Sequence, residues 1–82
     1  MAIYTSLGAK CKFICAEERI EHFDGEECPV WYVQAELLER YSDGSGKVGQ
    51  LLSDGQFIRA SRFVADDGFV EIDATCKALA AA

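Results

Sequence analysis

Aromatic residues and arginines in two parts of the sequence have the chemistry to bind a flat ligand. Trp31 and Tyr32 are adjacent, and Arg59 and Arg62 follow Phe57 later in the chain. Aromatic rings stack on bases and other planar groups, and a guanidinium adds a cation–π contact. The candidate ligand-binding residues are therefore Trp31, Tyr32, Arg59 and Arg62. Aromatics that fill a small core beside two solvated arginines would give the same pattern.

Cysteine and histidine side chains offer a second possible chemistry, the binding of a metal. The five residues concerned are Cys11, Cys15, His22, Cys28 and Cys76. On a strand, Cys11 and Cys15 would share a face about 13 Å apart, which is too far for one zinc ion or one disulfide. A Cys/His zinc site would require several elements to converge, whereas free cysteines commonly serve as small core residues. We therefore predict no metal ligand and no cofactor.

Two further patterns bear on catalysis and nucleotide binding. Residues 44–49 match G-x-G-x-x-G, but a dinucleotide site needs this motif at the start of a helix inside a βαβ unit. Here a strand-like segment follows, so we interpret these glycines as a turn. His22 has no evident partner that would make it a catalytic base. The sequence therefore predicts no catalytic residue, and we lean towards a protein that is not an enzyme.

The charge of the chain is concentrated in one segment. The net charge is −6, and residues 17–27 hold six carboxylates against one arginine and one histidine. A broad phosphate-binding face needs clustered lysines and arginines, so we expect no nucleic-acid partner. The simplest interpretation of residues 17–27 is a solvated strand end and turn. The functional alternative is a docking patch for a basic protein or a divalent ion, although the spacing does not match a calcium loop.

Asp-Gly pairs divide the chain into the elements that would position these residues. The four pairs are Asp24-Gly25, Asp43-Gly44, Asp54-Gly55 and Asp67-Gly68. Asp-Gly between apolar and β-branched residues favours a two-residue hairpin turn, because both positions tolerate a positive φ. The expected strands cover residues 10–16, 28–41, 47–53 and 56–63, with a last pairing between 63–64 and 69–72. Residues 2–7 form either a short edge strand or an irregular start, and Asp73 is expected to cap a final helical turn at 74–81.

These elements predict one all-β domain covering residues 1–82. We expect a five-stranded antiparallel meander that resembles an SH3-like small barrel, with a short C-terminal helical turn. The alternative is an α+β fold in which residues 30–41 are helical, because 35–40 have high helix propensity while 30–33 favour a strand.

The sequence also predicts where the protein is located and what it does. The first residues lack a signal-peptide pattern and no apolar run is long enough to span a membrane, so we expect a cytoplasmic protein with free thiols. The favoured hypothesis is a small acidic binding or accessory domain that contacts a protein partner or forms a homo-oligomer. Its small size suggests an origin in a phage or mobile gene cassette. The alternatives are a small-molecule site or minor enzyme between subunits, and the zinc site.

Overall fold

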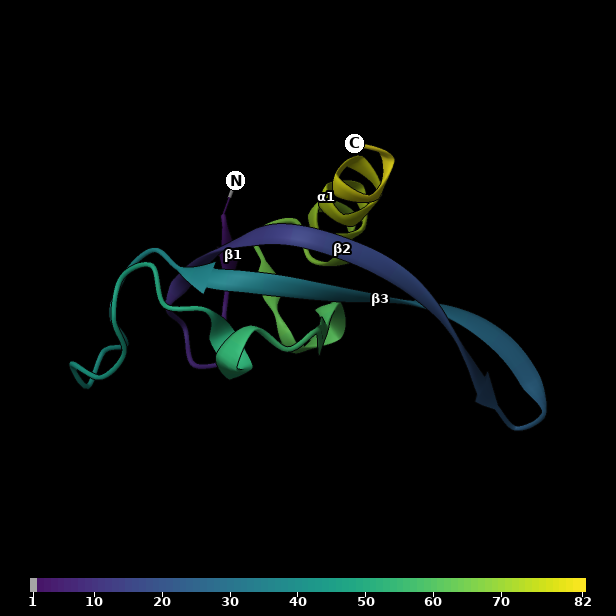
Figure 1. The fold of residues 1–82 in the computed structure, drawn as a ribbon, viewed down its shortest axis with the longest axis horizontal. Coiled ribbons are helices and arrows are strands. Elements are labelled where there is room, and N and C mark those ends of the chain that lie inside the picture. Colours follow the sequence, from purple (N-terminus) through teal and green to yellow (C-terminus); the bar gives the residue numbers. More distant parts are fainter. Residues whose placement is uncertain (1) are drawn as a thin grey trace.

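The computed structural model describes residues 2–82 and is mostly β, with one C-terminal α-helix (Figure 1). A curled, half-barrel sheet of five antiparallel strands has the order β4-β3-β2-β1-β5. The strands are β1 (Ile3–Tyr4), β2 (Lys10–Phe23), β3 (Glu26–Leu37), β4 (Ile58–Arg59) and β5 (Val64–Ala65). The helices are the 3₁₀ turns η1 (Leu52–Gly55) and η2 (Ala60–Arg62) and the α-helix α1 (Phe69–Ala81).

The long hairpin β2–β3 dominates the sheet. Its turn is the Asp24-Gly25 pair, with φ of 50° and 83°, and Phe23 faces Glu26 across it. The positive φ at both positions is the reason this dipeptide forms a tight hairpin. The prediction of a strand in the segment 28–41 is confirmed up to Leu37, and the helical alternative for 30–41 is wrong.

A β-bulge between Phe13 and Cys15 changes which side chains face the core. Cys11 is paired with Leu37 and is buried, whereas Cys15 is paired with Gln34, and its thiol donates a hydrogen bond to the Gln34 amide oxygen at 2.9 Å. The extra residue, Ile14, shifts the alternation by one position. The expectation that the two cysteines share a face is therefore wrong.

Residues 38–57 form loops and a 3₁₀ turn in place of the strand expected at 47–53. Only an isolated bridge between Glu36 and Leu51 remains of that strand. Ser53 and Asp54 both have a positive φ, of 52° and 54°, so the backbone coils at the Asp-Gly pair and does not form a hairpin. The strand expected at 56–63 is reduced to β4, which is followed by η2.

The chain end also differs from the expected pairing. Residues 69–72 form the first turn of α1, and β5 pairs with β1 instead. The helix thus begins well before the expected cap at Asp73, because Ile72, Cys76 and Leu79 recur at helical spacing and pack on the sheet. Strands β1 to β4 follow one another across the sheet as a meander. Strand β5 departs from this order, because it pairs with β1 at the edge of the sheet opposite β4.

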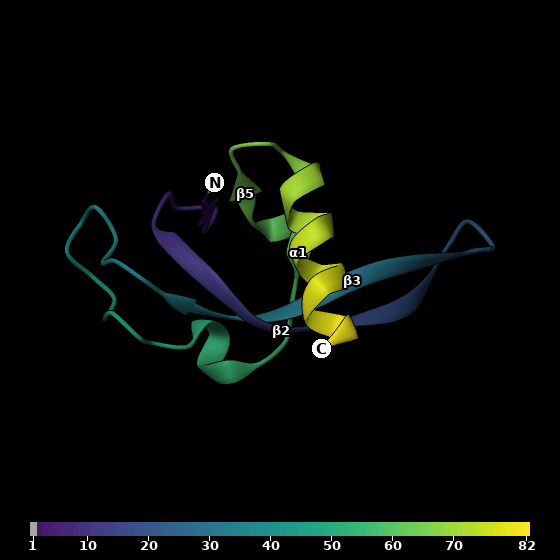
Figure 2. The ribbon, with the colours of Figure 1, turned by 90° about the horizontal axis from the view of Figure 1, so that it is seen from above.

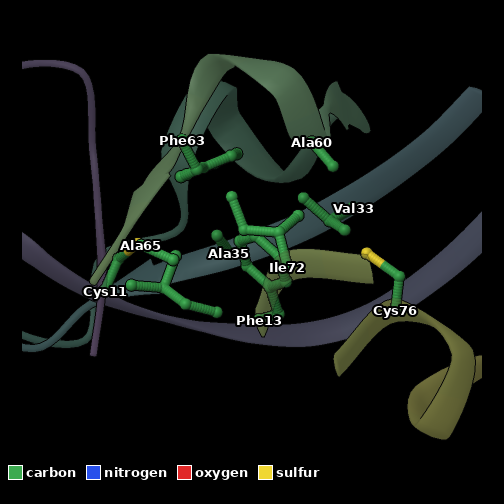
Figure 3. Close-up of a cluster of buried hydrophobic side chains, with 10 residues drawn as sticks. Cys11, Phe13, Val33, Ala35, Ala60, Phe63, Ala65, Ile72 and Cys76 are labelled. Atoms are coloured by element: carbon green, nitrogen blue, oxygen red, sulfur yellow. The ribbon is translucent and has the colours of Figure 1, made fainter. Parts of the chain in front are cut away.

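The core lies between the concave face of the sheet, η2 and α1 (Figure 3). The Phe13 and Phe63 rings meet edge to face, with centroids 4.9 Å apart. Ile72 from α1 lies among Phe13, Val33 and Ala35 in the close-up. One helix packed across a curled sheet is enough to bury this small cluster.

The distal half of the hairpin extends beyond this core. The molecule measures 43 × 22 × 22 Å, and both views show the β2–β3 hairpin reaching past α1 (Figures 1 and 2). Residues 17–20 and 22–27 are exposed, in contrast to Val33 and Ala35 in the same sheet. We call residues 17–27 the acidic arm.

Candidate functional site

The structure brings three of the four candidate ligand-binding residues together. Tyr32, Arg59 and Arg62 line one open hollow of about 280 Å³, together with Phe57. Tyr32 and Arg59 are direct partners across β3 and β4, which places their side chains next to each other. Trp31 lies on the face of β3 opposite Tyr32, because neighbouring residues of a strand point to opposite sides.

Trp31 connects the hairpin to α1. Its indole Nε1 donates a hydrogen bond to Asp73 Oδ1 at 3.1 Å. The ring borders a hollow of about 240 Å³ that Pro29, Phe69 and Ile72 also line. A half-buried indole with its N–H satisfied is a common packing arrangement, so Trp31 serves to fix α1 on the sheet.

A hydrogen-bonded cluster joins the acidic arm to β4. The Tyr32 hydroxyl donates to the Glu21 carboxylate, and the same carboxylate forms an ion pair with Arg59. Arg59 Nε also donates to the Tyr32 hydroxyl oxygen at 3.2 Å. Each polar group in the cluster thus has a partner from another strand, an arrangement that restrains side chains. Nothing in the sequence distinguishes Glu21 from the other five carboxylates of residues 17–27 as the one that contacts Tyr32 and Arg59.

Arg19 covers the same cluster from the side. Its guanidinium carbon lies 4.2 Å from the centre of the Tyr32 ring and 5.5 Å from that of Phe57. Arg19 also forms an ion pair with Glu17, with Nε 2.7 Å from Oε1. The position of Arg19, between two aromatic rings, is the one that a flat cationic group would otherwise occupy.

The contacts of this cluster limit what it can bind. Arg59 is engaged by Glu21 and Tyr32, whereas Arg62 is exposed and forms no ion pair within residues 2–82. The hollow is smaller than the roughly 300–1,000 Å³ typical of small-molecule sites. The cluster is therefore better suited to holding the arm against the body than to enclosing a ligand, and the ligand-binding role of these residues stays a prediction.

The acidic arm carries most of the net charge of the chain. Its six carboxylates and one arginine give −5, out of −6 for the whole sequence with histidine neutral. Glu18, Asp24 and Glu26 are exposed, and within residues 2–82 they form no ion pair. The Ile20 and Phe23 side chains lie among them and are 56% and 46% exposed. The arm therefore presents unneutralised carboxylates beside exposed apolar groups.

The cysteines do not converge with His22. Within the part of the chain that the structure describes, no group of three metal-ligating side chains is found. Burial raises the pKa of Cys11 to about 11, and burial together with the nearby Asp73 carboxylate raises the pKa of Cys76 to about 11. Both thiols are thus protonated at neutral pH, the unreactive form for metal binding and for nucleophilic attack.

One buried carboxylate was not singled out in the sequence. Glu71, in the first turn of α1, is 8% exposed, and its Oε2 has no hydrogen-bond partner within residues 2–82. It borders a hollow of about 310 Å³ with Lys10, Lys12 and Thr75. The N-terminal turn of a helix favours a negative charge, which partly offsets the cost of this burial.

No family model, curated protein or solved structure matches this chain. No helix within residues 2–82 is both long enough and apolar enough to cross a membrane.

Proposed function

We propose that this protein is a small, non-enzymatic binding domain whose acidic arm docks on a basic surface of another protein. The observation that supports the proposal is the separation of charge from core. The arm holds −5 of the net charge of −6 on a hairpin that extends past α1. Such a surface attracts a basic partner from solution and repels an acidic one.

The anchoring of the arm also favours a binding role. The contacts among Glu21, Tyr32 and Arg59 restrain the base of the hairpin. A preorganised hairpin loses little conformational entropy on binding, which would otherwise weaken the complex. The exposed Phe23 ring beside the carboxylates supplies the kind of aromatic contact that often contributes most to the affinity of an interface.

The other hypotheses from the sequence receive less support. A small-molecule site or minor enzyme needs a more enclosed pocket than the hollow beside Tyr32 and Arg62. The zinc hypothesis would require cysteines that the bulge and the core keep apart. A cytoplasmic location and an SH3-like assignment of the curled sheet remain predictions from the sequence, as does the absence of a nucleic-acid partner.

Neutralising the arm tests the proposed function. In the first variant, Glu18→Gln, Asp24→Asn and Glu26→Gln remove three carboxylates that form no ion pair within residues 2–82. The matched control carries Asp54→Asn, Asp66→Asn and Asp67→Asn, which change the net charge equally but lie on the body. Both variants and the original chain are immobilised, and proteins retained from an extract of the source organism are identified by quantitative mass spectrometry.

We expect a basic protein that the arm variant loses and the body control retains. Exposed ion pairs are worth about 0.2–1 kcal/mol each, so the arm variant should bind it roughly 3- to 100-fold more weakly. Affinity for the purified partner should also fall as salt is raised, because the contacts are solvent-exposed. Equal loss in both variants, or a partner that is not basic, would contradict the proposal.

A further inference from the structure

The two edges of the hairpin differ in their readiness to pair with another strand. Beyond its contacts with β1 at Lys10 and Cys11, β2 has no strand on its outer side among residues 2–82. An exposed strand edge is a template for a further strand. The outer edge of β3 carries Pro29 in the arm, and a proline at such an edge hinders pairing with a further strand, because it has no N–H to donate. Over residues 16–23, the outer edge of β2 has no proline and no bulge.

Two observations show which backbone groups point outwards from β2. In the two-residue turn, Phe23 and Glu26 face each other as a hydrogen-bonded pair, and this role alternates along an antiparallel ladder. Ile20 and Pro29 therefore form a non-hydrogen-bonded pair. This position suits Pro29, because proline has no N–H to donate to β2. The N–H and C=O groups of the even-numbered residues 18, 20 and 22 thus point to the free edge.

The side chains along this edge complement those of an identical antiparallel strand from a second copy of the chain. The sequence from Glu17 to Phe23 reads Glu-Glu-Arg-Ile-Glu-His-Phe. If a second copy pairs antiparallel about Ile20, Glu18 lies opposite the partner's His22. In the same pairing, Arg19 lies opposite the partner's Glu21, and the two Ile20 side chains meet at the centre. No carboxylate lies directly opposite another carboxylate along this stretch.

Neighbouring registers lack this complementarity. Residues whose backbone groups point outwards must face each other, so the register can shift only in steps that conserve this match. A shift in one direction places Arg19 opposite the partner's Arg19 and Glu17 opposite the partner's Glu21. A shift in the other direction places Glu21 opposite the partner's Glu21. Like charges directly opposite each other destabilise a sheet, so the register centred on Ile20 is favoured.

We propose that two copies of this chain pair through the outer edges of β2, about a two-fold axis at Ile20, and extend the sheet across a dimer. A two-fold interface of this kind uses the same surface patch on both copies. Strand addition supplies main-chain hydrogen bonds for affinity and opposite side chains for register. The dimer goes beyond the proposed basic partner and does not depend on it, because it forms from this chain alone.

Charge reversal at two opposed positions tests the register. One variant carries Glu18→Lys and His22→Lys, so that lysine faces lysine twice in its homodimer. The other carries His22→Glu, so that Glu18 faces a new carboxylate twice. Mixing the two variants places lysine opposite carboxylate at both positions. Molar mass is measured by sedimentation equilibrium from micromolar to millimolar concentration, on the original chain, each variant alone and the mixture.

We expect the original chain to form dimers, each variant to dissociate at least about 10-fold more readily, and the mixture to recover the original affinity. A monomer at every concentration would overturn the proposal, as would dimers that both variants retain or a mixture that fails to recover. Because none of these measurements includes a basic partner, their failure is distinct from failure of the proposed function.

A backbone variant tests the same edge without changing charge. Ile20→Pro removes an N–H that points outwards and leaves the ladder to β3 complete, whereas Ile20→Thr keeps it as a matched control. Circular dichroism verifies that both variants are folded. Loss of the dimer in the proline variant alone supports pairing at this edge, and a dimer unaffected by proline overturns it.

Discussion

At the scale of single residues, the four thiols divide into two classes. Cys11 and Cys76 are 4% and 0% exposed and lie in the hydrophobic core, whereas Cys15 and Cys28 are only partly buried. A thiolate is charged and a core does not solvate it, so both core thiols have a raised pKa of about 11. The buried cysteines thus contribute packing and no reactivity in the folded state.

This difference predicts how stability depends on alkaline pH. The folded protein holds the Cys11 and Cys76 protons more tightly than the unfolded chain, whose thiols have the ordinary pKa of about 9.0. The free energy of unfolding therefore includes their full contribution below pH 9 and decreases as the pH rises towards 11. We therefore expect the urea midpoint of unfolding to fall as the pH is raised from about 9 to about 11.

A double variant isolates the thiols from the lysines and tyrosines that titrate in the same range. With Cys11→Ala and Cys76→Ala, stability at neutral pH falls because buried volume is lost, but the slope with pH should flatten. An unchanged slope would show that the core thiols do not cause the alkaline loss. As an independent measurement, a thiol reagent at pH 8 should modify Cys15 and Cys28 first, and the core thiols only as the protein unfolds.

Two glycines in the loop after β3 separate backbone strain from packing. Gly44 and Gly46 both have a positive φ, of 85° and 82°. A Cβ at position 44 meets nothing within 4 Å, whereas one at 46 would lie 3.0 Å from side-chain atoms of Leu37 and Tyr41. Leu37 is fully buried, so it has little room to move.

We expect Gly44→Ala to cost about 1 kcal/mol, from the left-handed conformation alone. Gly46→Ala should cost about 1–3 kcal/mol more, because the added methyl group displaces Leu37 or Tyr41. Urea unfolding of the two variants measures both terms, and the Gly44 variant serves as the control. Equal losses would mean that the loop shifts to accommodate the methyl group.

At the scale of elements, the sequence predicts structure best where one local signal acts alone. Asp24-Gly25 fixes a turn between two long strands, and β2 and β3 follow from it. Asp54-Gly55 has the same residues, but Ser53 also adopts a positive φ, so the chain coils into η1. Asp67-Gly68 precedes a segment whose β-branched residues favour a strand, yet the spacing of Ile72 and Cys76 places it in α1. Tertiary packing decides both cases.

The same reasoning explains what was predictable of the candidate site. Tyr32 and Arg59 are adjacent only because β3 and β4 pair at those residues, a register that composition does not contain. The separation of Trp31 from Tyr32 was predictable, because strand neighbours alternate between faces. The bulge at residues 13–15 was not, because it is defined by the pairing of β2 with β3 and no glycine marks it in the sequence. The charge of the arm, in contrast, is fully visible in the sequence.

At the scale of the whole molecule, the core and the charged surface occupy different parts of one hairpin. Residues near Phe13 and Val33 contact η2 and α1. The contacts of the arm with the body include those of Arg19 with Phe57 and of Glu21 and Phe23 with Arg59. Repulsion among the arm carboxylates therefore acts where little apolar surface is buried. This separation lets the chain carry a strongly acidic surface without placing that charge against its core.

Native-state hydrogen exchange should reveal this division as two levels of stability. Ladder amides in residues 11–13 and 33–37 belong to the buried sheet, so we expect them to exchange only on global unfolding. Ladder amides of Arg19, Glu21 and Cys28 should exchange through local opening of the arm, at a free energy lower by about 2 kcal/mol or more. Low urea should accelerate the exchange of only the core amides, those in residues 11–13 and 33–37.

Glu21→Gln weakens the ion pair with Arg59 and should lower protection of the arm amides from exchange, while the core amides keep their protection. If core and arm amides responded together to urea and to this substitution, the hairpin would be one cooperative unit from Lys10 to Leu37, and the division into a stable core and a less stable arm would be wrong.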